Sequence, residues 1–263
     1  MRRIGPGLAA YLGLLLLFLA TPVLVVIACA FTSADFVTFP PQGFSTKWFA
    51  QVLRDPQFVR PLWNSIRIGL LSTALSSVLA VPAALALARG ERGVALVQAF
   101  LLSPLSLPTI VLAVGLLFFT ARIGLGSSLT GLVIGHAVIT VPYMLRTVVG
   151  VYAGMNRELE EAAAVLGADS WRVFRHVTLP TIRPGILAGA IFAFLLSFDE
   201  VPVALLLSNT DTVTLPVSIL SYLVYNYDPA VAAISTVQIL IVVVVLLALE
   251  RVFGVKHLLL ASK

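Results

Sequence analysis

Long apolar runs separated by short polar segments fill almost the whole of this 263-residue chain. A run of ~20 apolar residues is long enough to cross the ~30 Å hydrocarbon core of a membrane as a helix. Six such runs are present, at about residues 8–31, 64–88, 94–119, 129–152, 185–207 and 230–249. The pattern predicts an all-α polytopic membrane protein with six transmembrane helices, which form a single transmembrane domain over residues 1–263.

The first apolar run follows the short basic start Met1-Arg2-Arg3, as in a signal peptide. At ~24 residues it is longer than the apolar part of a signal peptide, so we expect an uncleaved first helix. Residues 32–60 are more polar and contain Phe44, Trp48 and Phe49, which predicts an external loop with a short interfacial helix. Residues 208–229 predict a second external loop, and two prolines, Pro104 and Pro108, are expected to break the third run.

The longest polar interruption in the second half of the chain covers residues 157–180. Three acidic residues and three alanines predict the start of a helix, and Gly167 is expected to end it in a left-handed conformation. A second short helix is expected through Val177, with Asp169 or Ser170 as its N-cap. Pro180 and Pro184 are expected to close the unit.

Composition excludes a water-soluble globular protein, because 59% of the residues are hydrophobic, only 11% are charged, and the mean hydropathy is +1.04. The net charge of +5 comes from basic residues scattered at the ends of the apolar runs. This distribution indicates orientation in a membrane among its lipids, not nucleic-acid binding. It places both termini and the segment 157–180 on the cytoplasmic side.

Two features that the sequence lacks, a second cysteine and a phosphate-binding motif, limit the chemistry that the chain can perform. The single cysteine, Cys29, allows no internal disulfide. The sequence has no Gly-Lys-Ser/Thr of a phosphate-binding loop, so the energy for transport has to come from a partner.

Two acidic residues, Asp199 and Glu200, lie inside the fifth apolar run. Each costs on the order of 2.5–3.5 kcal/mol to insert, so we expect the pair to face protein or a water-filled cavity. Together with Ser197, three residues before Glu200, they form a candidate substrate-binding site that suits an ammonium ligand. The alternative is an ion pair with Arg67 or Arg146 of a neighbouring helix.

Smaller signals in the apolar runs indicate packing. Gly131 and Gly135, and likewise Gly185 and Gly189, have the spacing that lets membrane helices approach closely. His136 is expected to be buried and hydrogen-bonded, since no nucleophile motif accompanies it.

The segment 157–180 resembles the signature of ATP-binding-cassette (ABC) importer permeases. The matching positions are Glu161, Ala162, Ala163, Gly167, Val177, Leu179 and Pro180. The resemblance implies the type I ABC importer permease fold, in which this cytoplasmic loop forms coupling helices that dock into a groove of a cytoplasmic ATPase. The contacts it implies are Glu161, Ala162, Ala163, Gly167, Ala168 and Asp169.

Further motifs, among them Ser197-Phe198-Asp199-Glu200 and Tyr227-Asp228-Pro229, are similar to those of spermidine/putrescine-type permeases. That resemblance implies an ABC ATPase dimer that binds ATP and Mg²⁺, a second related permease as heterodimer partner, and an external solute-binding protein. It also implies a bacterial inner-membrane location. Thr109 stands where many of these permeases carry an acid, which weakens the case for a polycation.

The sequence therefore predicts a permease subunit that performs no catalysis, carries no cofactor or metal, and moves a small solute from periplasm to cytoplasm. A polyamine or related amine is the expected solute, with another small amine or an amino-acid-like compound as alternatives. A secondary transporter driven by an ion gradient is the alternative mechanism, in which the buried carboxylates would carry protons.

Overall fold

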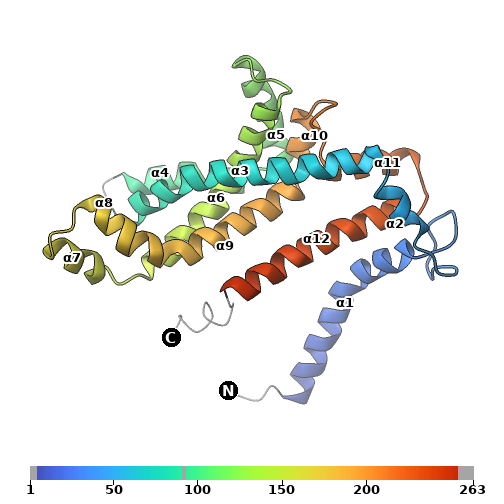
Figure 1. Ribbon diagram of the computed structural model, residues 1–263, viewed down its shortest axis with the longest axis horizontal. Helices are drawn as coiled ribbons and strands as arrows, with labels where there is room; N and C mark the ends of the chain where they lie inside the picture. Colours follow the sequence, from blue (N-terminus) through green and yellow to red (C-terminus); the bar gives the residue numbers. More distant parts are fainter. Residues whose placement is uncertain (1–4, 91–92, 254–263) are drawn as a thin grey trace. The chain divides into compact units, whose positions relative to one another are not determined.

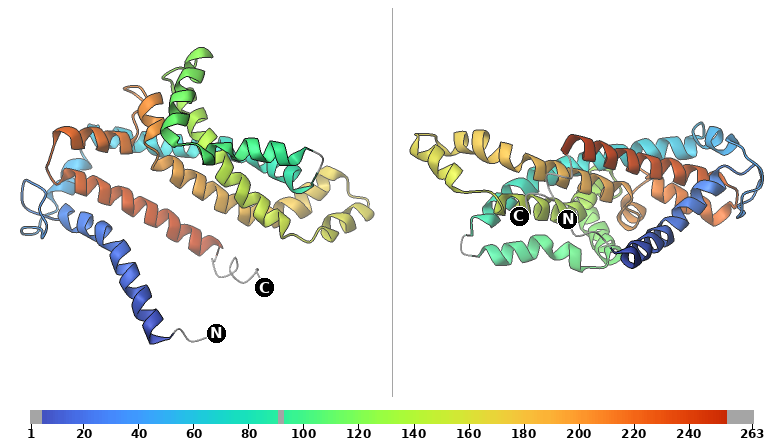
Figure 2. Two further views of the ribbon diagram at one scale, coloured as in Figure 1. Left: turned by 180° about the vertical axis from the view of Figure 1, so that it is seen from behind. Right: turned by 90° about the horizontal axis from the view of Figure 1, so that it is seen from below.

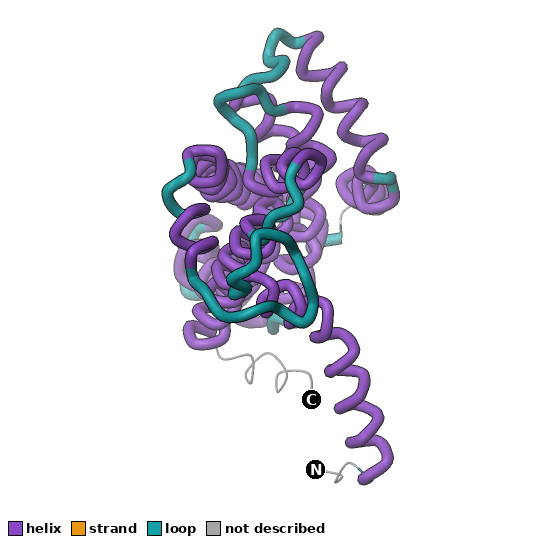
Figure 3. The backbone as a smooth tube through the Cα atoms, turned by 90° about the vertical axis from the view of Figure 1, so that its right-hand side faces the viewer, coloured by secondary structure: helices purple, strands orange, loops and turns teal. Residues whose placement is uncertain are grey.

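A computed structural model of the protein describes residues 5–90 and 93–253. These residues form helices joined by turns and loops, without a strand in the described part (Figure 1, Figure 3). They divide into two compact units, one of residues up to 60 with 218–243, the other of 61–217 with the residues from 244 onward. The expectation of one domain for residues 1–263 stays a prediction.

The first unit contains the N-terminal helix α1 (Pro6–Ala30), the short helix α2 (Lys47–Val52), most of α11 (Leu215–Tyr225) and the first part of α12 (Ala230–Phe253). Asp228 connects the last two, because one carboxylate oxygen accepts from the Ala230 N–H at 3.0 Å and the other from the Tyr222 hydroxyl at 2.7 Å. Burial and this bond raise the pKa of the Tyr222 phenol, so Tyr222 remains a neutral donor.

The second unit holds most of the long helix α3 and the elements up to the first residues of α11. In chain order they are α3 (Pro56–Ala88), α4 (Val94–Leu102), η1 (Ser103–Ser106), α5 (Thr109–Arg122), α6 (Leu129–Ala153), α7 (Glu158–Val165), α8 (Ser170–Val173), the π-helical turn η2 (Phe174–Thr178), α9 (Leu179–Phe198) and α10 (Pro202–Leu207).

Five described helices are long and apolar enough to cross a membrane, and the count becomes six if α4–η1 and α5 together make one span. These two pieces meet at an angle of 109° around Pro108, which lacks the backbone N–H that a continuous helix needs. The expected break in the third span is therefore confirmed, and so is the all-α polytopic fold.

Two predicted boundaries were wrong. The second span begins at Pro56 instead of residue 64, because Asp55 accepts the Gln57 N–H at 2.8 Å as a helix cap and Pro56 suits a first helical turn. The segment 208–229, expected as a loop, contains α11. The short helix expected in residues 32–60 is present as α2, and its position at the membrane interface stays a prediction.

The fifth span differs most from the prediction of residues 185–207. A helix runs without interruption from Ser170 to Phe198, so Pro180 and Pro184 do not close the coupling unit. The π-helical turn η2 ends two residues before Pro180, and its wider hydrogen bonding accommodates a proline that would clash in a regular helix. The helix ends at Asp199 instead, and α10 is a separate short helix.

Helices α6 and α9 lie side by side along much of their length (Figure 2). The approach depends on Gly185 and Gly189, where an added Cβ would come within 2.8 Å of Val151 and 2.6 Å of Met144. Helices in lipid pack closely where such small residues face a neighbour. The predicted packing role of this glycine pair is confirmed.

The core of the second unit has two apolar clusters with a polar layer between them. One cluster includes Ile68 and Leu132, and the other includes Ala80 and Met144. The polar layer lies between them along α3 and α6, with one residue from α9, and its buried members are Ser72, Ser76, His136, Thr140 and Ser197. Hydrogen bonds across the helices join Ser72 to Ser197, Ser76 to Thr140 and Ser197 to His136 Nδ1, so most of these polar groups have a partner in the apolar interior.

Candidate functional site

The polar segment 157–180 forms the helix pair that the sequence predicts. Helix α7 begins with Glu158, Glu160 and Glu161 in its first turn. It ends in a Schellman cap, in which Ala168 N–H donates to the Ala163 carbonyl and Gly167 N–H to the Ala164 carbonyl. Gly167 has φ +88°, so the expected left-handed residue is confirmed.

Helix α8 begins at Ser170, and its N-cap is Asp169, one of the two candidates. The Asp169 carboxylate accepts the Arg172 backbone N–H at 2.8 Å and pairs with the Arg172 side chain at 3.4 Å. Both side chains are exposed, so the ion pair contributes little to stability. The cap fixes the direction in which the chain enters the long helix 170–198.

Large apolar side chains are exposed on this helix pair. Val165 is 87% and Leu166 is 88% exposed at the turn, with Trp171 also exposed on α8. The predicted ATPase contact Glu161 is exposed as well. Exposed apolar side chains next to acidic ones are typical of a surface that a protein partner covers.

A carboxylate that the sequence reasoning did not single out connects this helix pair to the transmembrane helices. Glu160 accepts from the Tyr152 hydroxyl at 3.0 Å through one oxygen and from the Thr178 hydroxyl through the other. Tyr152 lies in the last turn of α6, and Thr178 is the last residue of η2. The Arg157 guanidinium donates to the Ala88 carbonyl at the end of α3 and lies 5.8 Å from the Tyr152 ring.

A hollow of about 360 Å³ lies between α7, α8 and the ends of α3 and α6, and it is lined in part by Tyr152, Arg157 and Glu160. Its lining includes Arg89, Glu161 and Ser170. The hollow is half polar in character and lies next to the exposed apolar turn, so a partner that covers the turn also closes over charged groups.

The two acidic residues of the fifth span lie at its break. Asp199 is exposed and caps the end of α9, whereas Glu200 is 8% exposed. One Glu200 carboxylate oxygen accepts the Val203 N–H at 3.1 Å, which caps the start of α10. Arg67 and Arg146, the ion-pair partners of the alternative interpretation, are both exposed.

Ser197 does not direct its hydroxyl toward Glu200. Its oxygen accepts from Ser72 at 3.0 Å and shares a 2.7 Å hydrogen bond with His136 Nδ1. His136 is therefore buried and hydrogen-bonded, as expected, while its Nε2 has no partner among the described residues. The structure brings Ser197 into the polar layer of the helix core.

Glu200 borders a small cavity of about 90 Å³ together with Thr109 and Tyr143. Thr109 is the first residue of α5, directly after the break in the third span. The break in the third span and the break in the fifth span thus meet at one polar cavity. Sequence reasoning noted Thr109 only as a departure from a family pattern, and Tyr143 gave no signal.

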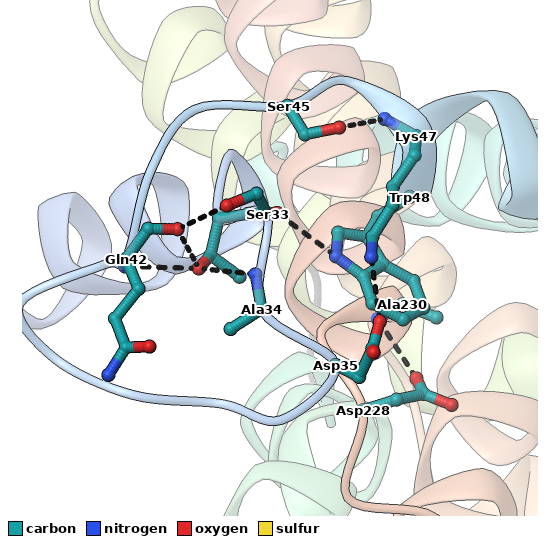
Figure 4. Close-up of polar contacts among 10 residues, drawn as sticks. Ser33, Ala34, Asp35, Gln42, Ser45, Lys47, Trp48, Asp228 and Ala230 are labelled. Carbon is teal, nitrogen blue, oxygen red and sulfur yellow. Dashed lines mark hydrogen bonds and ion pairs between the residues drawn. The ribbon is translucent and has the colours of Figure 1, made fainter.

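In the first unit, the loop between α1 and α2 is folded on itself (Figure 4). Asp35 pairs with Lys47 at 2.7 Å, and the Trp48 indole donates to the Thr32 carbonyl at 3.1 Å. The Ser33 hydroxyl donates to the Gln42 carbonyl at 2.8 Å. Trp48, expected at the membrane interface, is buried and holds this loop together.

Comparison with known proteins identifies one family and several relatives. The family described as "Binding-protein-dependent transport system inner membrane component" matches residues 76–254. The spermidine/putrescine transport system permease protein PotC of Escherichia coli is 27% identical over 236 residues, which cover 89% of each chain. The putrescine transport system permease protein PotI of the same species is 29% identical over 83% of this chain and 80% of its own.

Solved structures share the fold at lower identity. A bacterial ABC transporter involved in the import of the acidic polysaccharide alginate matches with a TM-score of 0.72 and 18% identity over 93% of this chain and 94% of the other. The MetNI methionine ABC transporter matches with a TM-score of 0.65 and 20% identity over 76% of this chain and 95% of the other.

Proposed function

Because this chain belongs to the family of binding-protein-dependent transport system inner membrane components, and is thus a permease subunit of an ATP-driven importer, we propose that its solute is a polyamine or a related small amine. The predicted type I importer fold is confirmed by the solved structures. The chain is a multi-pass membrane protein and a transport subunit, whereas ATP hydrolysis belongs to a separate ATPase.

The observation that carries the solute proposal is the buried Glu200 carboxylate at a polar cavity, in a chain similar to permeases named for spermidine and putrescine over most of its length. The cavity is small, about 90 Å³, so we propose that it takes only one ammonium end of the solute. Glu200 would bind one ammonium end, and the exposed Asp199 would face the rest of the solute.

Uptake of radiolabelled spermidine by the complete importer in proteoliposomes tests this proposal. We expect Asp199→Asn with Glu200→Gln to lower kcat/KM at least tenfold, because both attractive charges are lost. Asp211→Asn removes an exposed carboxylate of the loop before α11 and serves as the control with parental uptake. Parental uptake in the double variant, with the complex intact, would disprove the site.

We propose that the partners are an ABC ATPase dimer that binds ATP and Mg²⁺, a second related permease, and an external solute-binding protein. Family membership supports a binding protein and a transport complex. Basic residues at the span ends support placing both termini and α7–α8 in the cytoplasm, with the loop of Figure 4 outside.

We further propose that Glu161, Ala162, Ala163, Gly167, Ala168 and Asp169 form the contact with the ATPase. The exposed Val165, Leu166 and Trp171 beside them support an apolar centre for this contact, with the acidic residues at its edge. ATP binding would then move the helix pair and favour one of two permease conformations.

A further inference from the structure

We propose that Glu160 is the positioning residue that transmits movement of the ATPase-contacting helix α7 to α6 and α9 at the same time. This inference rests on the proposed coupling role of α7–α8. It assigns Glu160 a role that differs from that of its neighbour Glu161, which is exposed toward a partner.

Glu160 accepts hydrogen bonds from two residues that lie in different transmembrane helices. Its two carboxylate oxygens are used separately, one by Tyr152 at the end of α6 and one by Thr178 at the start of α9. Both hydroxyl-bearing residues are 1% exposed, while Glu160 itself is half-buried. Hydrogen bonds to an ionised carboxylate are stronger than neutral ones, so the three side chains move as a group.

A second contact adds α3 to the same group. Arg157, the N-cap of α7, donates to the Ala88 carbonyl in the last turn of α3 and lies over the Tyr152 ring. Helix α7 is therefore held at its N-terminal turn by the cytoplasmic ends of α3, α6 and α9.

The connection to α9 leads directly to the candidate solute site. From Thr178 the helix runs without a break to Phe198, a length of about 30 Å at ~1.5 Å per residue. Asp199 and Glu200 follow immediately. A displacement of α7 that is carried by Glu160 reaches the break in the fifth span through one continuous helix.

The test uses the complete importer with its ATPase and binding protein. In Glu160→Ala the Tyr152 and Thr178 hydroxyls both lose their acceptor. We expect the ATPase still to co-purify and to hydrolyse ATP. The amount of spermidine transported per ATP hydrolysed should fall about tenfold. Tyr152→Phe with Thr178→Val removes the same two hydroxyl donors at nearly constant shape, and we expect the same loss. Adding Glu160→Ala to this pair should cause no further loss.

Glu158→Ala is the matched control, because Glu158 lies in the same turn but is exposed and contacts only its neighbour Asn156 in the hydrogen bonds found here. We expect it to transport within twofold of the parent. A parental ratio of spermidine to ATP in Glu160→Ala, or in the Tyr152→Phe Thr178→Val pair, would overturn the proposal.

Hydrogen exchange provides a readout that does not depend on the solute. In the parental complex we expect ATP and Mg²⁺ to change the backbone exchange rates of both α7 and α9. In the Glu160→Ala complex we expect them to change the rates of α7 alone. A parental complex that shows this pattern without transporting spermidine contradicts the solute proposal only. Equal changes in α9 with and without Glu160 contradict the inference about Glu160.

Discussion

Ser197 shows how a single hydroxyl can belong to a helix core while lying next to a candidate binding site. It bonds Ser72 and His136 inside the polar layer, two residues before the exposed Asp199. Its predicted contact with solute stays a prediction, and its contacts in the helix core suggest a structural role that can be tested separately.

We expect Ser197→Ala to lower the free energy of unfolding by about 1–2 kcal/mol, because a buried histidine and a buried serine lose a partner in an apolar environment. Unfolding of the purified subunit in detergent measures this change. Ser77→Ala is the control, since Ser77 bonds only the Thr73 carbonyl of its own helix. A raised KM for spermidine without loss of stability would instead place Ser197 in the solute site.

Residue types predicted the ends of helices well, because each end depends on the residue at one backbone position. Gly167 and Asp169 follow from cap chemistry that acts within a few residues. The bonds of Glu160 were not predictable, because Tyr152 and Thr178 become neighbours only after α6 and α9 pack. The sequence pattern singles out Glu161 of the same turn, and nothing in it points to Glu160.

At the scale of elements, the turn between α7 and α8 depends on one left-handed residue. Gly167→Ala forces a side chain into φ +88°, which we expect to cost about 1–2 kcal/mol and to distort the Schellman cap. Because the proposed ATPase contact includes this turn, we expect less ATPase to co-purify with the permease, at an unchanged yield of permease.

Gly126→Ala is the matched control for this change. Gly126 lies in the turn between α5 and α6, its φ is not positive, and an added Cβ meets nothing within 4 Å. We expect normal ATPase recovery with this variant. Normal recovery with Gly167→Ala as well would show that the turn geometry does not control docking.

The apolar runs predicted which helices exist. Prolines were a poor guide to the residues at which some of these helices end. Pro108 does separate two helices, whereas Pro180 lies inside a continuous helix because η2 absorbs the missing hydrogen bond. Polar residues around α11 likewise predicted a loop, where the structure has a helix. Local composition does not show whether a neighbouring turn can compensate for a proline.

At the scale of the whole molecule, transport requires that ATP hydrolysis in a partner be communicated to the permease. We expect Glu161→Lys to leave the complex assembled but to reduce solute-stimulated ATPase activity and spermidine uptake together, at least tenfold, because the charge at the proposed contact is reversed. ATPase assays and uptake in proteoliposomes measure both quantities. Asp211→Lys, a charge reversal in the loop before α11, is the control. Normal coupling in Glu161→Lys would show that Glu161 is not part of the ATPase contact.

The fold alone does not determine the solute of such a permease. Solved structures of the same fold belong to importers of an acidic polysaccharide and of methionine, which differ in charge and size from any polyamine. We therefore expect the choice among solutes to depend on a few side chains at the breaks of the third and fifth spans, above all the proposed Glu200.

The π-helical turn η2 also fixes the rotational phase between the two ends of one long helix. A π-helical turn holds one residue more than an α-helical turn, so deletion of one residue from Phe174–Thr178 would let the segment continue as a regular α-helix. Such a deletion would leave the helix after it in nearly the same rotational phase, whereas winding the unchanged residues as a regular α-helix would rotate everything after them by about 100° relative to α8, given ~3.6 residues per turn. In that α-helical form Gly189 would turn away from Met144 on α6, so the extra residue in η2 keeps α8 and the packing face of α9 in register.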